Sequence, residues 1–278
     1  MGLLIAVLLG VVEGLTEYLP VSSTGHLLLV EAWLERSLGH GSEGGFAFDV
    51  VIQFGAILAV VVYYRRLLAV RVAGLVQRDP AAVRLWLSLA LAFLPTAVAG
   101  LLARKIIKTY FSGPLTVAAA LVAGGVLMIG VEWWQRRRAA SAGGAPPARS
   151  LEEVTPRQAF FIGVGQCFAL WPGMSRSMST IVSGQLVGLS TAAAAEFSFL
   201  LALPTLGAAT FLEAFASWDK LLDSFEGALA LLTGLVVSFV VALAVIAAFL
   251  RYLTRYGLTP FGYYRIVLGL AVAWALRP

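Results

Sequence analysis

This sequence has little charge, one cysteine and two histidines, and each shortage narrows the class of protein. Charged residues are 13% of the chain and hydrophobic residues 60%, whereas charged residues run at about 25% in soluble domains. The single Cys167 excludes an intramolecular disulfide and a cysteine-based metal cluster. This composition argues against a soluble protein. It predicts an all-α polytopic membrane protein, with residues 1–278 forming one integral membrane domain.

The charges that are present lie mostly between apolar runs. The net charge of +5 therefore does not indicate nucleic-acid binding. The N-terminus lacks a basic region and a clear cleavage site, so we do not expect a removable signal peptide. A run of about 20 apolar residues can cross a bilayer. By this measure the sequence predicts six transmembrane helices, at 46–64, 85–103, 115–134, 192–215, 228–250 and 259–276.

The remaining segments are predicted to be loops and two re-entrant hairpins. Residues 35–45, with His40 as a solvated residue, and the basic stretch 64–84 are predicted to be loops, and 139–153 a flexible linker. The connections at 64–84, 136–157 and 251–255 carry twelve Lys and Arg residues, against six on the opposite side. The positive-inside rule then places these connections in the cytoplasm and both termini outside.

The two halves of the chain resemble each other. Leu19-Pro20-Val-Ser-Ser23 aligns with Trp171-Pro172-Gly-Met-Ser175, and Leu-Pro95-Thr96 echoes Leu-Pro204-Thr205. Pro20 and Pro172 each follow a short apolar helix. Each proline is predicted to end that helix, because proline lacks an N–H donor. This pattern predicts an inverted repeat of 1–135 and 157–278, joined by a cytoplasmic linker at 136–156. The two breaks should meet near the membrane midplane.

Polar residues gather at the first break. Glu13 and Glu17 are spaced i,i+4 and share one helix face, where two like charges repel each other. A divalent cation such as Mg²⁺ or Ca²⁺ would compensate them, because hard cations prefer carboxylate oxygen. The break itself supplies hydroxyl groups and an imidazole suited to nucleophilic or acid–base work. These residues are Ser22, Ser23, Thr24 and His26.

The second break carries an anion-binding set. Arg176 is a fixed cation with five donors, which suits phosphate. Ser175, Ser177 and Thr180 add hydroxyls, and the backbone N–H groups of the following helix add an anion site. Taken with the carboxylates of the first break, this inventory predicts metal-assisted hydrolysis of a phosphate ester or anhydride.

These motifs resemble the two signatures of the bacterial undecaprenyl-diphosphate phosphatases, the bacitracin-resistance family. The signatures are Glu13-Gly-Leu-Thr-Glu17-Tyr-Leu-Pro-Val-Ser-Ser-Thr-Gly-His26 and Pro172-Gly-Met-Ser-Arg-Ser. Segments around Asp49 to Gln53, Glu196 and Pro260 to Arg265 are similar as well, so the resemblance covers the chain. Met178 departs from the family, which usually has glycine there, and is expected to stiffen the second break.

The resemblance implies hydrolysis of undecaprenyl diphosphate to undecaprenyl phosphate and inorganic phosphate, which recycles the lipid carrier of peptidoglycan synthesis. It implies a bacterial inner-membrane location, a site open to the periplasm and a divalent cation. Membrane lipids are expected partners, and a homodimer stays open. Glu13 and Glu17 would hold the metal or activate water, Ser23 would be the nucleophile, and His26 a base or competing nucleophile. Arg176, with Ser175 and Thr180, would bind diphosphate.

Several alternatives remain at this point. The sequence does not decide whether Ser23, Thr24 or His26 attacks phosphorus. Acid-phosphatase-like lipid phosphatases need a further arginine-histidine motif, and no histidine follows Arg176. A polyprenyl-phosphate transporter or flippase could use the same broken helices. Among weaker candidates, Gln53 and Glu196 could support the site, while Arg265 could pair with Glu196 or bind a lipid phosphate.

Overall fold

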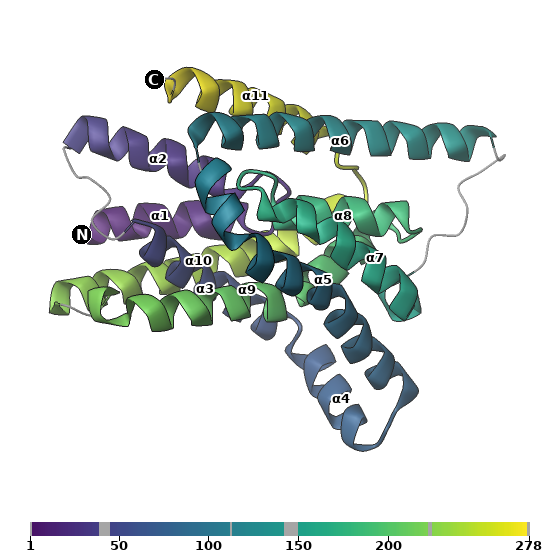
Figure 1. Cartoon of the computed structure of the whole chain (residues 1–278). Helices are drawn as coiled ribbons and strands as arrows, with labels where there is room; N and C mark the ends of the chain where they lie inside the picture. Colours follow the sequence, from purple (N-terminus) through teal and green to yellow (C-terminus); the bar gives the residue numbers. More distant parts are fainter. Residues whose placement is uncertain (1, 39–44, 112, 142–149, 222–223, 277–278) are drawn as a thin grey trace.

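The computed structural model describes residues 2–38, 45–111, 113–141, 150–221 and 224–276, and these residues form helices without strands. Figure 1 shows long helices running side by side, with a shorter pair, α4 and the start of α5, projecting from the bundle. The α-helices are α1 (Leu3–Thr16), α2 (Ser23–Leu38), α3 (Gly45–Tyr63), α4 (Arg65–Val76), α5 (Pro80–Tyr110), α6 (Pro114–Ser141), α7 (Pro156–Gln166), α8 (Arg176–Leu186), α9 (Thr191–Leu221), α10 (Phe225–Leu253) and α11 (Thr259–Ala275). Two 3₁₀ turns, η1 (Leu151–Glu153) and η2 (Cys167–Leu170), flank α7.

The surface is apolar and the interior contains many polar groups, which is the arrangement expected in lipid. Leu4, Leu102 and Phe215 are at least four-fifths exposed, whereas Glu13 and Arg265 are almost completely buried. The helices α5, α6, α9 and α10 are each long and apolar enough to cross a membrane, and α3 with α4 makes a fifth candidate. The chain is therefore a multi-pass helical membrane protein. The sixth predicted span corresponds to α11, whose 17 residues are fewer than in the other candidates.

The prediction that residues 64–84 form a loop is wrong. Most of it is helical, because α4 occupies Arg65–Val76 and α5 already begins at Pro80. The axis of α4 is bent by 74° from that of α3. The bend falls at Tyr64, which leaves the helical conformation with φ −94° and ψ 14°. Arginine, leucine and alanine are good helix formers, so a high charge content did not prevent a helix here.

The other predicted loops are shorter than expected. Helix α2 continues to Leu38 and α3 begins at Gly45, so both ends of the predicted 35–45 loop are helical. Helix α6 continues to Ser141, so the start of the predicted 139–153 linker is helical as well. The rest of these two stretches, at 39–44 with His40 and at 142–149, lies outside the described residues. At the end of the linker, η1 begins with a capping box between Ser150 and Glu153.

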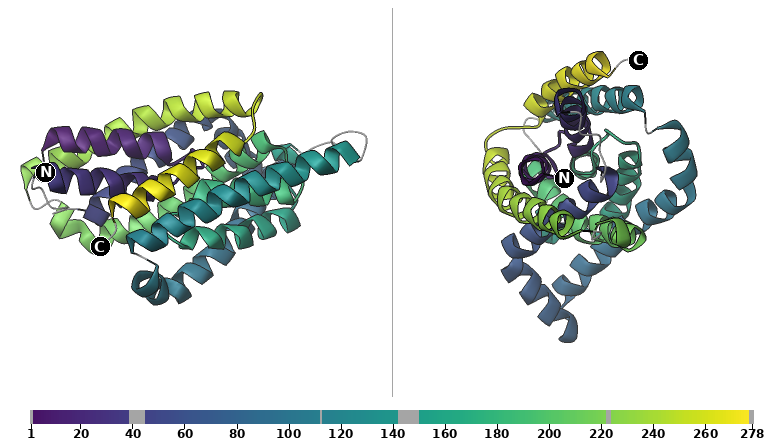
Figure 2. Two further views of the ribbon diagram at one scale, coloured as in Figure 1. Left: turned by 90° about the horizontal axis from the view of Figure 1, so that it is seen from above. Right: turned by 90° about the vertical axis from the view of Figure 1, so that its left-hand side faces the viewer.

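Glycines let several helix pairs approach closely. A Cβ atom on Gly10 of α1 would lie 2.6 Å from the carbonyl oxygen of Gly234 in α10. A Cβ on Gly125 of α6 would lie 2.6 Å from the carbonyl oxygen of Gly262 in α11. Small residues at such contacts are typical of helix packing in membranes. Figure 2 shows α6 and α11 lying along each other over most of the length of α11.

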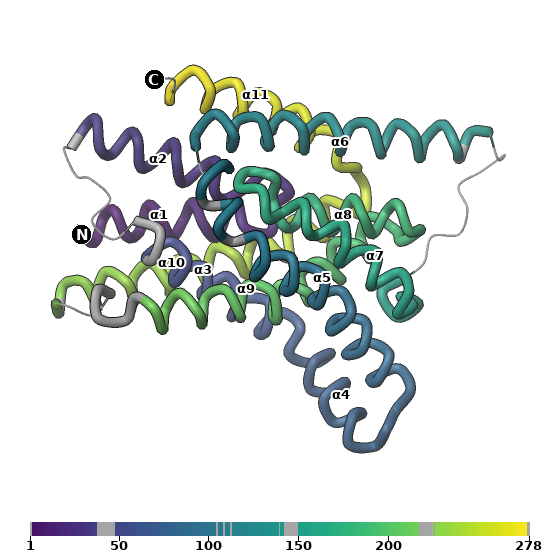
Figure 3. The backbone as a smooth tube through the Cα atoms, viewed as in Figure 1, coloured from purple at the N-terminus to yellow at the C-terminus, as the bar shows by residue number. Residues whose placement is uncertain are grey.

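Two hairpins enter this bundle from opposite ends. In Figure 3, α1 and α2 extend from the left of the view to the middle, while α7 and α8 extend from the right to the middle. The turns that join α1 to α2 and η2 to α8 meet there. Ser177 in α8 donates a hydrogen bond of 2.9 Å to the carbonyl of Leu19 beside the first turn, which confirms that these turns touch.

Candidate functional site at the two helix breaks

Both breaks use a serine in a left-handed backbone conformation. Ser22 has φ 74° and Ser175 has φ 71°, values that are uncommon for residues other than glycine. Each serine then caps the helix that follows. The Gly25 N–H donates to Ser22 Oγ over 3.4 Å, and the Met178 N–H donates to Ser175 Oγ over 3.3 Å. Strained backbone of this kind clusters at functional sites.

A buried ion pair joins the first hairpin to the second. Arg176 Nη2 lies 3.0 Å from Glu17 Oε1, and both side chains are less than a tenth exposed. Arg176 Nη1 donates to the carbonyl and the hydroxyl of Ser198 in α9. Arg176 Nε is buried without a partner among the described residues, so one donor of this guanidinium remains for a ligand.

The second oxygen of Glu17 faces the predicted nucleophile. Ser23 Oγ donates to Glu17 Oε2 over 3.0 Å, and Gln53 Nε2 donates to the same oxygen over 3.0 Å. Ser23 is the first residue of α2 and is partly exposed, and the contact with Glu17 orients its hydroxyl. Thr24 is exposed beside it. The predicted role of Gln53 as a supporting residue agrees with this contact.

Further carboxylates lie behind Glu17. Glu13 is 1% exposed and lies close enough to Glu17 and Asp49 to repel both electrostatically. One oxygen of Glu13 and one of Asp49 are buried without a hydrogen-bond partner among the described residues. Buried carboxylate oxygens of this kind call for a proton or a cation, because an unpaired buried charge is costly.

These carboxylates fit a divalent cation that is only partly held by protein. The described residues contain no group of three or more His, Cys, Asp or Glu side chains arranged to hold a metal. Mg²⁺ commonly uses one or two carboxylates and completes its shell with water and substrate phosphate. The unpartnered oxygen of Glu13, with Glu17 beside it, is compatible with that mode.

His26 is held at both ring nitrogens. Its Nδ1 lies 2.8 Å from the carbonyl oxygen of Ser22, and its Nε2 lies 2.7 Å from the Tyr264 hydroxyl of α11. No hydrogen bond joins His26 to Ser23 among the described contacts. The geometry therefore pairs Ser23 with Glu17, and not with the histidine.

The hydroxyls of α8 are mostly engaged with protein. Ser177 and Thr180 are fully buried. The Thr180 hydroxyl lies 2.6 Å from the Ser198 hydroxyl, and Ser177 donates to the carbonyl of Leu19. Ser175 is partly exposed, and it lies next to the first N–H groups of α8, which have no intrahelical acceptors. Their predicted role in substrate binding stays a prediction.

Arg265 binds the backbone of both breaks. Its side chain is completely buried, and among the described residues its hydrogen bonds all go to carbonyl oxygens. The acceptors are those of Pro20 in the first break, Gly173 and Met174 in the second, and Ala120 and Leu121 in α6. The expected pairing with Glu196 or a lipid phosphate is therefore wrong, because backbone oxygens take up the donors of this guanidinium.

Sequence reasoning missed several residues of this cluster. Asp49 precedes Gln53 by four residues in an apolar helix, and that spacing could have placed both on the face near Glu17. Ser198 and Tyr264 carry no such signal, because serine and tyrosine are common in membrane helices. Their importance appears only when α9 and α11 are packed against the breaks.

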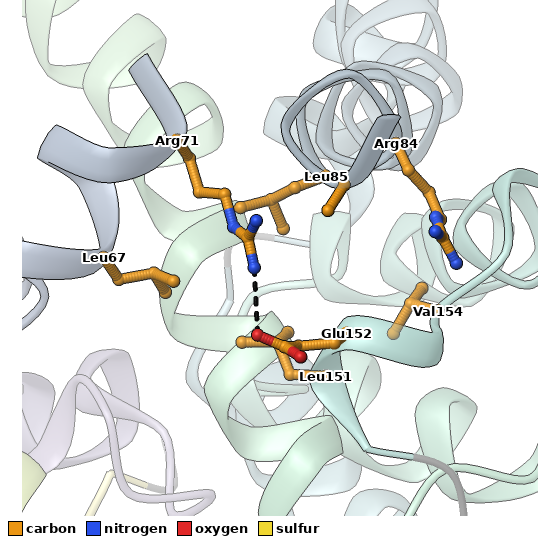
Figure 4. A pocket seen from close by; sticks show the side chains of 8 residues that line it. Leu67, Arg71, Arg84, Leu85, Leu151, Glu152 and Val154 are labelled. Atoms are coloured by element: carbon orange, nitrogen blue, oxygen red, sulfur yellow. Dashed lines mark hydrogen bonds and ion pairs between the residues drawn. The ribbon is translucent and has the colours of Figure 1, made fainter. Parts of the chain in front are cut away.

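A separate recess lies between α4, α5 and η1 (Figure 4). Its lining includes Arg71, Arg84 and Glu152, and it shares no residue with the cluster at the breaks. Arg71 forms ion pairs with Glu152 at 2.9 Å and Asp79 at 3.5 Å. These contacts tie α4 to the segment that precedes the second hairpin.

The fold and the cluster together define a class: a multi-pass helical membrane protein with an arginine–carboxylate site at two opposed helix breaks. Comparison with known proteins narrows this class. Residues 6–271 match the family described as bacitracin resistance protein BacA, and the chain belongs to that family.

Named relatives agree with this assignment. An undecaprenyl-diphosphatase of Sorangium cellulosum is 62% identical over 269 residues, covering 97% of this chain and 85% of the relative. An undecaprenyl-diphosphatase of Rhizorhabdus wittichii is 44% identical over 277 residues, covering 99% and 98%. One from a Thermoanaerobacter species is 44% identical over 269 residues, covering 95% and 93%. The similarity therefore extends over nearly the whole chain.

Proposed function

We propose that this protein hydrolyses undecaprenyl diphosphate to undecaprenyl phosphate and inorganic phosphate, and so recycles the lipid carrier of peptidoglycan synthesis and confers bacitracin resistance. The observation that carries the proposal is the position of Glu17. One oxygen of the Glu17 carboxylate accepts a hydrogen bond from the Ser23 hydroxyl, and the other forms an ion pair with the Arg176 guanidinium. A nucleophile, its base and a phosphate-binding cation thus meet within one cluster.

The contacts support one order of steps. Ser23 Oγ attacks the terminal phosphorus while its proton passes to Glu17 Oε2. The bond from that phosphorus to the bridging oxygen breaks, and undecaprenyl phosphate leaves with the electron pair. Water then attacks the phosphoserine and releases inorganic phosphate, which regenerates the Ser23 hydroxyl. Arg176 Nε and the first N–H groups of α8 stabilise charge on the phosphoryl oxygens.

A divalent cation, Mg²⁺ or Ca²⁺, is part of this proposal. Glu13 and Glu17 would hold it, and it would supply positive charge to the diphosphate. The unpartnered buried oxygen of Glu13 supports this assignment.

The finer architecture we propose is six transmembrane helices and two re-entrant hairpins in an inverted repeat. Matching the helices in chain order pairs α1 with α7, α3 with α9, α5 with α10 and α6 with α11. The helix contacts support this pairing, because α1 packs on α10 as α7 packs on α5. Two of the matched pairs, α3 with α9 and α6 with α11, also pack on each other. The Leu-Pro-Thr echo does not belong to it, since Pro95 lies in α5 and Pro204 in α9.

We also infer the orientation and location. The basic ends of α6 and α10 and the arginines of α4 mark the cytoplasmic side by the positive-inside rule. The α1–α2 hairpin then enters from the outer side of a bacterial inner membrane, and the site opens towards the periplasm. Chain termini on the outer side follow from the same orientation.

The test is phosphate release from undecaprenyl diphosphate by the purified protein with Mg²⁺, with Ca²⁺ and with EDTA. We expect release that requires a cation and falls by at least about 10³-fold in Ser23→Ala, as for removal of a covalent nucleophile. Ser141→Ala, at the far end of α6, is the matched control and should retain wild-type turnover. Release that survives Ser23→Ala but not His26→Ala would assign the attack to the histidine instead.

A transporter of polyprenyl phosphate is the second candidate. The observation that favours it is the meeting of two hairpins from opposite ends of the bundle, an architecture that transporters share. A carrier would bind undecaprenyl diphosphate in the same assay without releasing phosphate under any cation condition. It would move a labelled lipid phosphate between the leaflets of vesicles.

A further inference from the structure

The histidine of the first break is held in one tautomer by a residue from the other end of the chain. The Ser22 carbonyl, 2.8 Å from His26 Nδ1, can only accept a hydrogen bond. In the neutral imidazole Nδ1 therefore carries the proton, and Nε2 has the lone pair. The Tyr264 O–H then donates to Nε2 over 2.7 Å.

The packing around Tyr264 fixes this contact. The rings of His26 and Tyr264 stack with centroids 5.6 Å apart and planes 12° from parallel. The next residue of α11 is Arg265, whose completely buried guanidinium donates to the carbonyl of Pro20 in the first break. Because Arg265 fixes α11 against this break, the Tyr264 hydroxyl is held at a constant place relative to His26.

We propose that Tyr264 is a positioning residue for His26. It keeps the imidazole in the Nδ1–H tautomer by donating to the Nε2 lone pair, and the Tyr264 side of this contact is 47% exposed. This inference rests on the proposed hydrolysis together with the predicted role of His26 as a base, which in that scheme acts on the water that attacks the phosphoserine. It extends that proposal to a residue that contacts none of the reacting groups directly.

The neighbouring tyrosine provides a matched control. Tyr263 is more exposed than Tyr264, and it makes no hydrogen bond among the described contacts. The experiment compares Tyr264→Phe with Tyr263→Phe, both purified as full chains with ¹⁵N-labelled histidine. The sequence has only two histidines, so ¹⁵N–¹H correlation spectra contain two imidazole patterns, and His26→Gln assigns them. Phosphate release from undecaprenyl diphosphate gives kcat and KM for the same samples.

We expect the wild-type protein and Tyr263→Phe to show the Nδ1–H pattern for His26. In Tyr264→Phe the Nε2 signal should shift and a second tautomer should appear. The kcat should fall about three- to tenfold with KM within about twofold, the size expected for one lost hydrogen bond. Tyr264→Gln, which keeps a donor, should retain more activity than Tyr264→Leu.

Identical His26 nitrogen signals in wild-type and Tyr264→Phe would overturn the proposal, as would altered signals with unchanged kcat. The spectra do not depend on turnover. If the wild-type protein released no phosphate, the proposed function would fail while the spectra still decided whether Tyr264 positions His26. Equal melting temperatures of the two Phe variants exclude loss of the fold as the cause of any difference.

Discussion

The two helix breaks share a backbone device and differ in what they expose. Ser22 and Ser175 both take a left-handed conformation and both cap the next helix with Oγ. After the first break, Ser23, Thr24 and His26 remain at least partly exposed. After the second, Arg176 and the two residues that follow it are buried. One geometry therefore presents reactive groups in the first break and a buried cation in the second.

This difference suggests a division of labour. The first break supplies groups that exchange protons or attack phosphorus. The second supplies charge and a helix N-terminus that binds anions. The ion pair between Glu17 and Arg176 is the contact through which each break depends on the other. Substitutions at shared contacts should affect both breaks, while substitutions at the caps should affect one break at a time.

The largest effect is expected from removing the shared ion pair. Arg176→Ala removes the phosphate donor and leaves the Glu17 carboxylate buried without its partner. We expect kcat/KM for phosphate release to fall about 10³-fold or more. Arg176→Lys keeps the charge but not the planar fork, and should recover only part of this loss. Arg251→Ala, an exposed arginine at the end of α10, is the control.

The pair should also behave as a unit. The double variant Glu17→Gln/Arg176→Ala should be no less active than the worse single variant, because groups that act together are not additive. Fully additive losses would mean that each residue acts alone. In that case the structural link between the breaks would have no functional counterpart.

A second, smaller effect is expected at Arg265, which serves both breaks without entering the chemistry. Arg265→Gln leaves several buried carbonyl oxygens unpaired, so the free energy of unfolding should fall by about 3 kcal/mol. Hydrogen exchange should rise in peptides covering both 20–26 and 172–178. Peptides from the middle of α10 serve as the internal control. Faster exchange at one break only would contradict the idea that Arg265 joins them.

The smallest effect is expected at the two caps. Ser22→Ala and Ser175→Ala each remove a cap and keep a side chain in a left-handed conformation, which should lower stability by about 1–2 kcal/mol. Ser22→Gly and Ser175→Gly relieve the conformation and should cost only a few tenths of a kcal/mol. Melting temperatures in detergent should therefore rank glycine above alanine at both positions. The opposite ranking at either one would show that the breaks do not share this device.

The breaks themselves could be predicted because their signals are local. Pro20 and Pro172 each stand beside polar residues at the end of a short apolar stretch, unlike Pro95 and Pro204, which lie inside α5 and α9. Glu17 and Arg176 are conspicuous in apolar surroundings. The all-helical membrane fold followed from the apolar runs. Helix α4 could not be predicted from its charge, because positive residues indicate the side of the membrane and not the secondary structure.

The partners of Arg265 were unpredictable for a different reason. A buried arginine suggests a carboxylate partner, and Glu196 was the available one. The structure instead supplies carbonyl oxygens, which every residue carries and which therefore leave no trace in the sequence. Which carbonyls turn inward depends on how the breaks pack. The same holds for Tyr264, whose contact with His26 spans 238 positions.

The position of Arg265 also has a consequence for biosynthesis. The ribosome makes a chain from its N-terminus, so α1, α2, α7 and α8 reach the membrane before α11. Until α11 arrives, the carbonyls of Pro20, Gly173 and Met174 lack the donor that they have in the finished protein. A nascent chain that ends before α11 can insert both hairpins and still have no fixed site. Insertion of the last helix is therefore the step at which the site is completed, and a chain released too early would be inserted in the membrane but inactive.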